Sequence, residues 1–123
     1  MRKSKERSNK LGEVFTSEKL VNSSIRGIPK KEFRNPERTF LDPACGNGNF
    51  LVEILKRKLA NDHNPLEALS TIYGIDIMED NVLECRERLL KIAGESEEAS
   101  KIVKKNIRVA DCLKIKNIEE FCN

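Results

Sequence analysis

Hydrophobic and polar positions along this chain predict three short strands separated by helices. The apolar runs at Thr39–Leu41, Thr71–Ile77 and Asn106–Ala110 are short and rich in β-branched or aromatic residues, which favours buried strands. One helix is expected to open within Asn47–Phe50, and a second covers Glu79–Ala93. Strands that alternate with helices are typical of an α/β fold with a parallel sheet.

Both expected helices carry an apolar stripe at helical spacing. The first stripe consists of Leu51, Val52, Ile54, Leu55 and Leu59, and the second of Val82, Leu83, Leu89, Leu90 and Ile92. Such stripes predict that each helix covers the sheet with one face. Turn-forming residues in 29–38 indicate a polar linker, and the acidic stretch Gly94–Glu98 is expected to be a helix end and loop.

The first third of the chain differs from the rest in charge. Residues 1–40 hold eleven basic and five acidic side chains, whereas residues 41–123 hold twelve and fifteen. Residues 1–11 have almost no apolar content, which predicts a disordered basic arm, either a phosphate contact on DNA or a solvated tail. We expect residues 12–38 to form an N-terminal helical segment and residues 39–123 to form one α/β domain.

The most informative segment is the run Asp42–Phe50, Asp-Pro-Ala-Cys-Gly-Asn-Gly-Asn-Phe, directly after the first strand. Gly46 and Gly48 allow unusual backbone angles and let a ligand approach without a Cβ in the way. The first N–H groups of the following helix lack intrahelical acceptors and point at such a ligand. The run therefore predicts a nucleotide-binding corner. The alternative is a generic strand–turn–helix of another α/β domain.

The residues around the two glycines distinguish between ligands. A dinucleotide fingerprint needs a third glycine, at the position where this chain has Leu51. Asp42, at the strand end, would repel a pyrophosphate but could accept hydrogen bonds from an ammonium group. A ligand with a cationic amino-acid end and an adenosine end therefore fits these residues better.

The run resembles the S-adenosylmethionine (SAM) loop of DNA adenine-N6 methyltransferases, Asp/Glu-Pro-Ala-Cys-Gly-x-Gly-x-Phe. This resemblance implies a class-I SAM-dependent methyltransferase fold, with its Rossmann-like sheet truncated here to about three strands. It also implies that SAM is the cofactor and that residues of the loop bind it. These residues are Asp42, Ala44, Gly46, Asn47, Gly48 and Phe50.

Upstream, the segment Gly12–Ser17 resembles the family's Gly-x-Phe-Thr-Pro element, which closes over the methionine end of SAM. The resemblance makes Phe15 a packing wall and Thr16 a polar contact to the carboxylate. The alternative is a core phenylalanine and a helix cap. Ser17 departs from the usual proline, but serine is a favourable N-cap for the helix expected to follow.

Two further acids end the second and third strands. Ligands of doubly wound sheets bind at the carboxyl ends of strands, and the two oxygens of Asp76 match both ribose hydroxyls. The alternative for Asp76 is a helix cap. Similarity to the family's Gly-Ile-Asp-Ile makes Ile77 a wall of the adenine pocket. Asp111-Cys112-Leu113 resembles the element whose acid accepts from the 6-amino group of adenine; its alternative is a turn acid.

The family's catalytic tetrapeptide, Asn/Asp/Ser-Pro-Pro-Tyr/Phe, is absent, because no two of the four prolines are adjacent. That tetrapeptide accepts both hydrogens of the target amine and stacks on a flipped base, so no catalytic residue is assigned. We expect the SAM-binding part of an adenine-specific restriction-modification methyltransferase, incomplete and inactive alone. Its partners would be DNA, through the complete enzyme, and a C-terminal half or second subunit that completes the sheet.

Two other functions remain open, a degenerate SAM-binding module without catalysis and an N-methyltransferase that acts on protein or RNA. The four cysteines form no Cys-x-x-Cys pair and the chain has a single histidine, His63, which excludes the familiar zinc patterns. No metal is therefore expected. The sequence shows neither an apolar run of about 18 residues nor a cleavable signal, so we expect a cytoplasmic protein without membrane contact.

Overall fold

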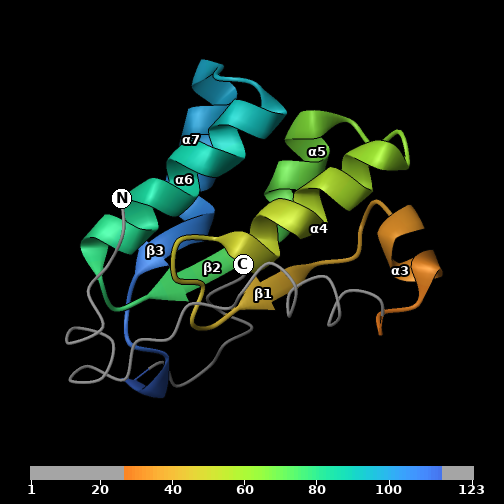
Figure 1. Ribbon diagram of the computed structural model, residues 1–123. Helices are drawn as coiled ribbons and strands as arrows, with labels where there is room; N and C mark the ends of the chain where they lie inside the picture. Colours follow the sequence, from red (N-terminus) through yellow and green to blue (C-terminus); the bar gives the residue numbers. More distant parts are fainter. Residues whose placement is uncertain (1–26, 115–123) are drawn as a thin grey trace.

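The computed structural model describes residues 27–114, and its centre is a three-stranded parallel sheet (Figure 1). The strands are β1 (Phe40–Asp42), β2 (Ile72–Asp76) and β3 (Ile107–Val109), in the order β1-β2-β3. The register pairs Asp42 with Gly74 and Asp76 with Val109. The carboxyl ends of the three strands therefore lie together at the same end of the sheet.

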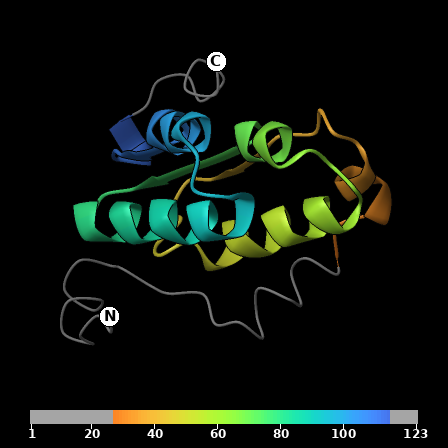
Figure 2. The ribbon, with the colours of Figure 1, turned by 90° about the horizontal axis from the view of Figure 1, so that it is seen from above.

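Helices fill the connections between the strands. They are α3 (Lys30–Arg34), α4 (Asn49–Ala60), α5 (Pro65–Ser70), α6 (Glu79–Ala93) and α7 (Glu97–Asn106), followed by the 3-10 turn η1 (Cys112–Lys114). In Figure 2 the strands lie between a layer formed by α4 and α6 and a second layer formed by α5 and α7. None of the helices within residues 27–114 is long and apolar enough to cross a membrane.

The predicted strands and the two long helices are confirmed: each strand boundary shifts by one residue, and the second helix covers Glu79–Ala93 as expected. Two predictions were wrong. The polar linker 29–38 contains α3, and Glu97 and Glu98 form the first turn of α7 rather than a loop. A further helix, α5, was not predicted, although Asn64 caps it by accepting from two backbone N–H groups.

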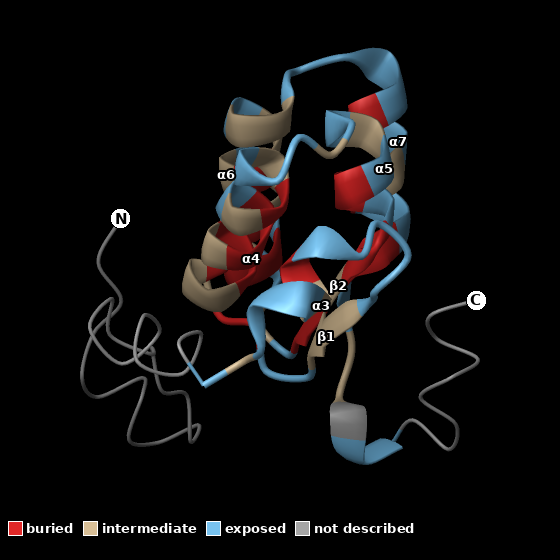
Figure 3. Cartoon of the chain, turned by 90° about the vertical axis from the view of Figure 1, so that its right-hand side faces the viewer, coloured by how far each residue is buried: buried red, intermediate tan, exposed pale blue. Residues whose placement is uncertain are grey.

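The hydrophobic core lies where the helices meet the sheet (Figure 3). Leu51 of α4 packs so closely on β2 that a Cβ on Gly74 would lie 2.7 Å from its Cδ1 atom. Val82, Cys85 and Leu89 form the buried stripe of α6. Leu83, assigned to that stripe from the sequence, is 52% exposed, because one residue after Val82 the helix has turned by about 100°.

A buried lysine lies beneath the start of β1. Lys58 of α4 has no exposed side-chain surface, and its Nζ donates to the main-chain oxygen of Arg38 at 2.7 Å. The ammonium also lies 5.4 Å from the centre of the Phe40 ring, which stacks on Phe33. Burial lowers the pKa of Lys58, because the apolar surroundings disfavour the charged form.

This burial makes folding stability depend on alkaline pH. A lysine whose pKa is lower in the folded state destabilises that state while it is charged, and the penalty fades as pH rises toward its ordinary value of 10.5. We predict that the unfolding free energy of the wild type rises relative to Lys58→Met between neutral pH and pH 10.5. Urea denaturation of both proteins at several pH values measures this, and a difference that is constant or falls contradicts it.

Candidate functional site

The loop between β1 and α4 has the backbone that its glycines were predicted to allow. Gly46 has a φ of 53° and Gly48 a φ of 93°, both in the left-handed region that favours glycine. Gly48 is the N-cap of α4, and its carbonyl accepts from Val52 to begin the helix. The loop therefore turns sharply from the carboxyl end of β1 into the N-terminus of α4.

Asp76 ties this loop to the end of the central strand. Its Oδ2 atom accepts from the backbone N–H of Gly46 at 3.0 Å. Its Oδ1 atom accepts from the N–H of Met78 at 2.8 Å and from the Asn81 amide at 3.3 Å. Asp76 is 7% exposed, and Met78 rather than Asp76 is the N-cap of α6. The carboxylate thus organises the corner, a role that the helix-cap alternative does not describe.

A second carboxylate lies beside it. Asp42, half-buried at the end of β1, accepts from the N–H of Ala44 at 3.1 Å. Burial raises the pKa of Asp42; the Ala44 hydrogen bond opposes this shift, and the charge of Asp76 adds to it. Two carboxylates at the ends of neighbouring strands create a negative field, so the corner favours a positively charged group over an anion.

The space next to Gly48 is filled by protein, which corrects one expectation. A Cβ on Gly48 would lie 2.6 Å from the Sγ atom of Cys85, so this glycine allows α6 to pack against the loop rather than a ligand to approach. Cys85 is also hydrogen-bonded to Cys45, and this contact together with burial raises the pKa of the Cys45 thiol. Both cysteines are free and buried, and they serve packing.

Exposed apolar side chains gather at the carboxyl ends of β2 and β3. Ile77 is 60% exposed and Val109 48% exposed, each directly at the end of its strand. Leu113, in η1, is 91% exposed. Asp111 lies just after β3 and accepts from the N–H of Leu113. The carboxyl ends of the strands are where ligands of doubly wound sheets bind.

The other predicted residues divide into three groups. Phe50 and Asn47 are half-buried at the start of α4, and Ala44 is exposed in the loop. Cys112 is the first residue of η1. Phe15 and Thr16 lie outside the described residues, as do the basic arm and the helix expected after Ser17.

Two site residues were not predicted from the sequence. Asn81 of α6 is fully buried and donates to Asp76. Arg88, two turns further along α6, donates to the loop at Asn47 and to the side chain of Asn49. Both are polar residues at the buried or half-buried side of an amphipathic helix, which is the signal that sequence reasoning could have used.

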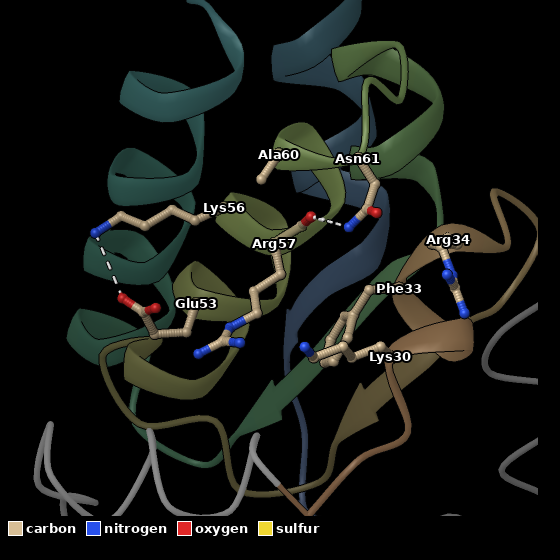
Figure 4. Close-up of a pocket in the computed structure, with 8 residues that line it drawn as sticks. All are labelled: Lys30, Phe33, Arg34, Glu53, Lys56, Arg57, Ala60 and Asn61. Carbon is tan, nitrogen blue, oxygen red and sulfur yellow. Dashed lines mark hydrogen bonds and ion pairs between the residues drawn. The ribbon is translucent and has the colours of Figure 1, made fainter.

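A cavity of about 450 Å³ lies at the other end of α4 and not at this corner (Figure 4). It is lined by residues of α3, of α4 from Glu53 onward and of the turn after it: Lys30, Phe33, Arg34, Glu53, Lys56, Arg57, Ala60 and Asn61. The described part of the chain contains no group of three or more His, Cys, Asp or Glu side chains that could hold a metal ion.

The parallel sheet and the strand–loop–helix corner define an α/β domain that fits a Rossmann-like methyltransferase fold. The sequence profile of the N-6 DNA Methylase family matches residues 1–119, so the chain belongs to this family. It is similar to the Type II methyltransferase M.VspI of Vibrio sp. (strain 343), with 35% identity over 89 residues. That match covers 72% of the chain and 19% of the relative. No solved structure matches the chain.

The packing of Gly48 leads to a prediction with an internal control. Gly48→Ala introduces both a left-handed alanine, which costs about 1–2 kcal/mol, and a clash with Cys85. We predict that Gly48→Ala lowers the unfolding free energy by more than the left-handed backbone alone would. The excess is the contribution of the contact with Cys85.

Cys85→Ala separates the two causes. Removing Sγ should restore part of the stability that Gly48→Ala loses, so the double variant is more stable than the two single effects would predict. Thermal unfolding of the wild type, Gly48→Ala, Cys85→Ala and the double variant measures this coupling. Strictly additive effects would mean that Cys85 does not limit the side chain at position 48.

Proposed function

We propose that this chain is the SAM-binding part of a DNA adenine-N6 methyltransferase with a class-I fold. The observation that carries the proposal is the pair of carboxylates, Asp42 and Asp76, on either side of the left-handed glycine turn. Membership of the N-6 DNA Methylase family supports this choice of ligand and reaction. The chain spans about a fifth of the length of this curated relative, so methyl transfer by this protein is a proposal.

The chemistry of the corner fits SAM at both ends of that molecule. Asp42 would accept from the ammonium group of the methionine end, which relieves the repulsion between the two carboxylates. The first backbone N–H groups of α4, preceded by Gly46, Asn47 and Gly48, would meet the carboxylate of the same end. Ala44 and Phe50 lie at the two ends of this turn.

The adenosine end would lie across β2 and β3. The Asp76 carboxylate already accepts from Gly46, Met78 and Asn81, but a carboxylate has about four acceptor sites, so it can still accept from one ribose hydroxyl. Ile77 supplies an exposed apolar surface for adenine, and Asp111 and Cys112 follow the neighbouring strand. Phe15 and Thr16 complete the proposal over the methionine end, by resemblance alone.

Bound SAM supplies an electrophilic methyl group, and the described residues can only hold and orient it. No Pro-Pro-aromatic tetrapeptide occurs in the 123 residues to polarise the target amine. DNA binding and transfer would therefore need a C-terminal half or a second subunit. Among the described residues, β1 and β3 each pair with a single strand, which leaves an edge on both sides for such a partner.

The first test uses the opposite demands of folding and binding on Asp42. An acid whose pKa is raised by folding destabilises the folded state as it ionises: the penalty is absent in acid, well below the ordinary pKa of 3.8, and grows as pH rises toward the folded-state pKa. Asp42→Asn keeps an oxygen that can accept from Ala44. We predict that it raises the thermal midpoint at neutral pH while weakening SAM binding about tenfold, as loss of a hydrogen bond to a charged group would.

Calorimetry with SAM and a thermal scan, both at pH 7, give the two values. Unchanged affinity would remove Asp42 from the proposed contact. A lower midpoint would contradict the destabilisation by the buried Asp42 carboxylate, to which burial contributes most and the charge of Asp76 less.

The second test changes the ligand, because Asp76 also holds the loop and its replacement would disturb the fold. S-adenosylhomocysteine should bind about tenfold more tightly than its 2′-deoxy analogue, since the analogue leaves one Asp76 oxygen without a hydroxyl partner. Titration of both ligands into the unmodified chain measures the ratio. Equal affinities would restrict Asp76 to its structural role.

The third test concerns activity. We predict that the chain alone transfers no methyl group to DNA above background, because a donor fixed without an oriented acceptor loses about 7–11 kcal/mol of positioning advantage. Tritiated-methyl transfer to mixed-sequence DNA is measured with the chain alone and with a candidate C-terminal partner. Incorporation by the chain alone would overturn this prediction. Incorporation only on mixing supports a divided enzyme, and binding without transfer in either case favours the degenerate SAM-binding module.

A further inference from the structure

Arg88 of α6 holds the cofactor loop from outside the motif. Its Nη1 atom donates to the main-chain oxygen of Asn47 at 3.0 Å and to the Oδ1 atom of Asn49 at 2.7 Å. The side chain is half-buried and reaches across the interface where α6 packs against α4. Hydrogen bonds from a charged donor in such a position are stronger than those between neutral groups.

The contact at Asn47 fixes a particular peptide group. The carbonyl of Asn47 and the N–H of Gly48 belong to one planar unit. Its N–H donates to the oxygen of Cys45 at 2.9 Å, and its carbonyl accepts from Arg88 on the opposite side. The orientation of this peptide is therefore held at both ends.

A peptide that precedes glycine can turn over at low cost, because glycine adopts positive and negative φ about equally well. Turning the Asn47–Gly48 peptide over would break both of its hydrogen bonds and direct the carbonyl dipole away from α6. In that orientation the carbonyl would face the main-chain oxygen of Cys45, which now accepts from the Gly48 N–H, so the turn that leads into the N-terminus of α4 would lose its geometry. Arg88 favours the orientation that leaves the carbonyl on the α6 side.

We infer that Arg88 is a positioning residue for SAM binding, which it supports by locking the Asn47–Gly48 peptide of the loop. The inference rests on the proposed function in so far as SAM is the ligand. Its ligand-independent part is the locked peptide. Preorganisation of this kind strengthens binding because the free protein then has less conformational freedom to lose when it binds the ligand.

Arg86 of the same helix provides a matched control. Its Nε atom donates to the oxygen of Ile107 at 2.8 Å, and its Nη2 atom to the oxygen of Lys104 at 3.3 Å. Both arginines thus join α6 to main-chain carbonyls, but Arg86 binds the start of β3 and the end of α7 instead of the loop. Arg86→Met should lower stability without acting on the cofactor corner.

The experiment combines amide hydrogen exchange with SAM titration for the wild type, Arg88→Met and Arg86→Met. We expect Arg88→Met to speed exchange of the Gly48 amide at least tenfold and to weaken SAM binding about tenfold. Arg86→Met should change either quantity less than twofold. Arg88→Lys, which keeps a donor, should retain more affinity than Arg88→Met. If Arg88→Met does not fold, Asn49→Ala removes one of the two contacts and should give smaller changes in the same direction.

The outcomes separate the inference from the function on which it rests. Unchanged Gly48 exchange in Arg88→Met overturns the locked peptide, whether or not SAM binds. Faster exchange with unchanged SAM affinity overturns the positioning role. Faster exchange in a chain whose wild type binds no SAM supports the locked peptide and contradicts the proposed function.

Discussion

The cofactor corner depends on the hydrogen bond that the Gly46 amide donates to the Asp76 carboxylate. Gly46 belongs to the loop after β1 and Asp76 to the end of β2, thirty residues later, so this contact joins two segments that only the parallel sheet brings together. The same carboxylate accepts from Met78 and Asn81 and thereby sets the start of α6. Because α6 then carries Cys85 and Arg88 to the loop, the helix and the loop define each other.

The corner is stabilised by hydrogen bonds and destabilised by its own charge. Burial raises the pKa of Asp42 and the neighbouring Asp76 adds to this shift, so the folded chain places a desolvated acid beside a second carboxyl group. Such strain is typical of sites whose ligand removes it. A cation between the two strand ends would offset the repulsion, which links the electrostatics of the chain without ligand to the charge of the proposed cofactor.

The sequence predicted those parts of the fold that strong local signals specify. The run Asp42–Phe50 carries its own turn chemistry, and the apolar pattern of α6 has full helical length, so the turn and the helix were confirmed, although Leu83 lies outside the buried stripe. Helices α3, α5 and α7 were missed because each is short or mostly exposed and is stabilised by caps and tertiary packing. Membership of the methylase family, predicted from the motifs, was confirmed.

The site was predictable only where a motif names its residues. Asp76 could be placed at a strand end from the sequence, but its bond to Gly46 depends on strand order, which local patterns do not give. Arg88 and Cys85 were outside any motif, since they contact the loop from a helix that follows it by about forty residues. Gly48 was expected to leave room for a ligand, whereas the side chain that an added Cβ would meet is that of Cys85.

The most direct test of this account is a nitrogen-15 NMR titration of the chain with SAM, with NAD as the comparison. We predict that SAM changes the amide chemical shifts of Gly46, Gly48, Asp76 and Ile77. NAD should cause no comparable change, because its pyrophosphate would meet the two carboxylates. Equal or larger shifts with NAD, or SAM-dependent shifts confined to residues of the cavity between α3 and α4, would contradict it.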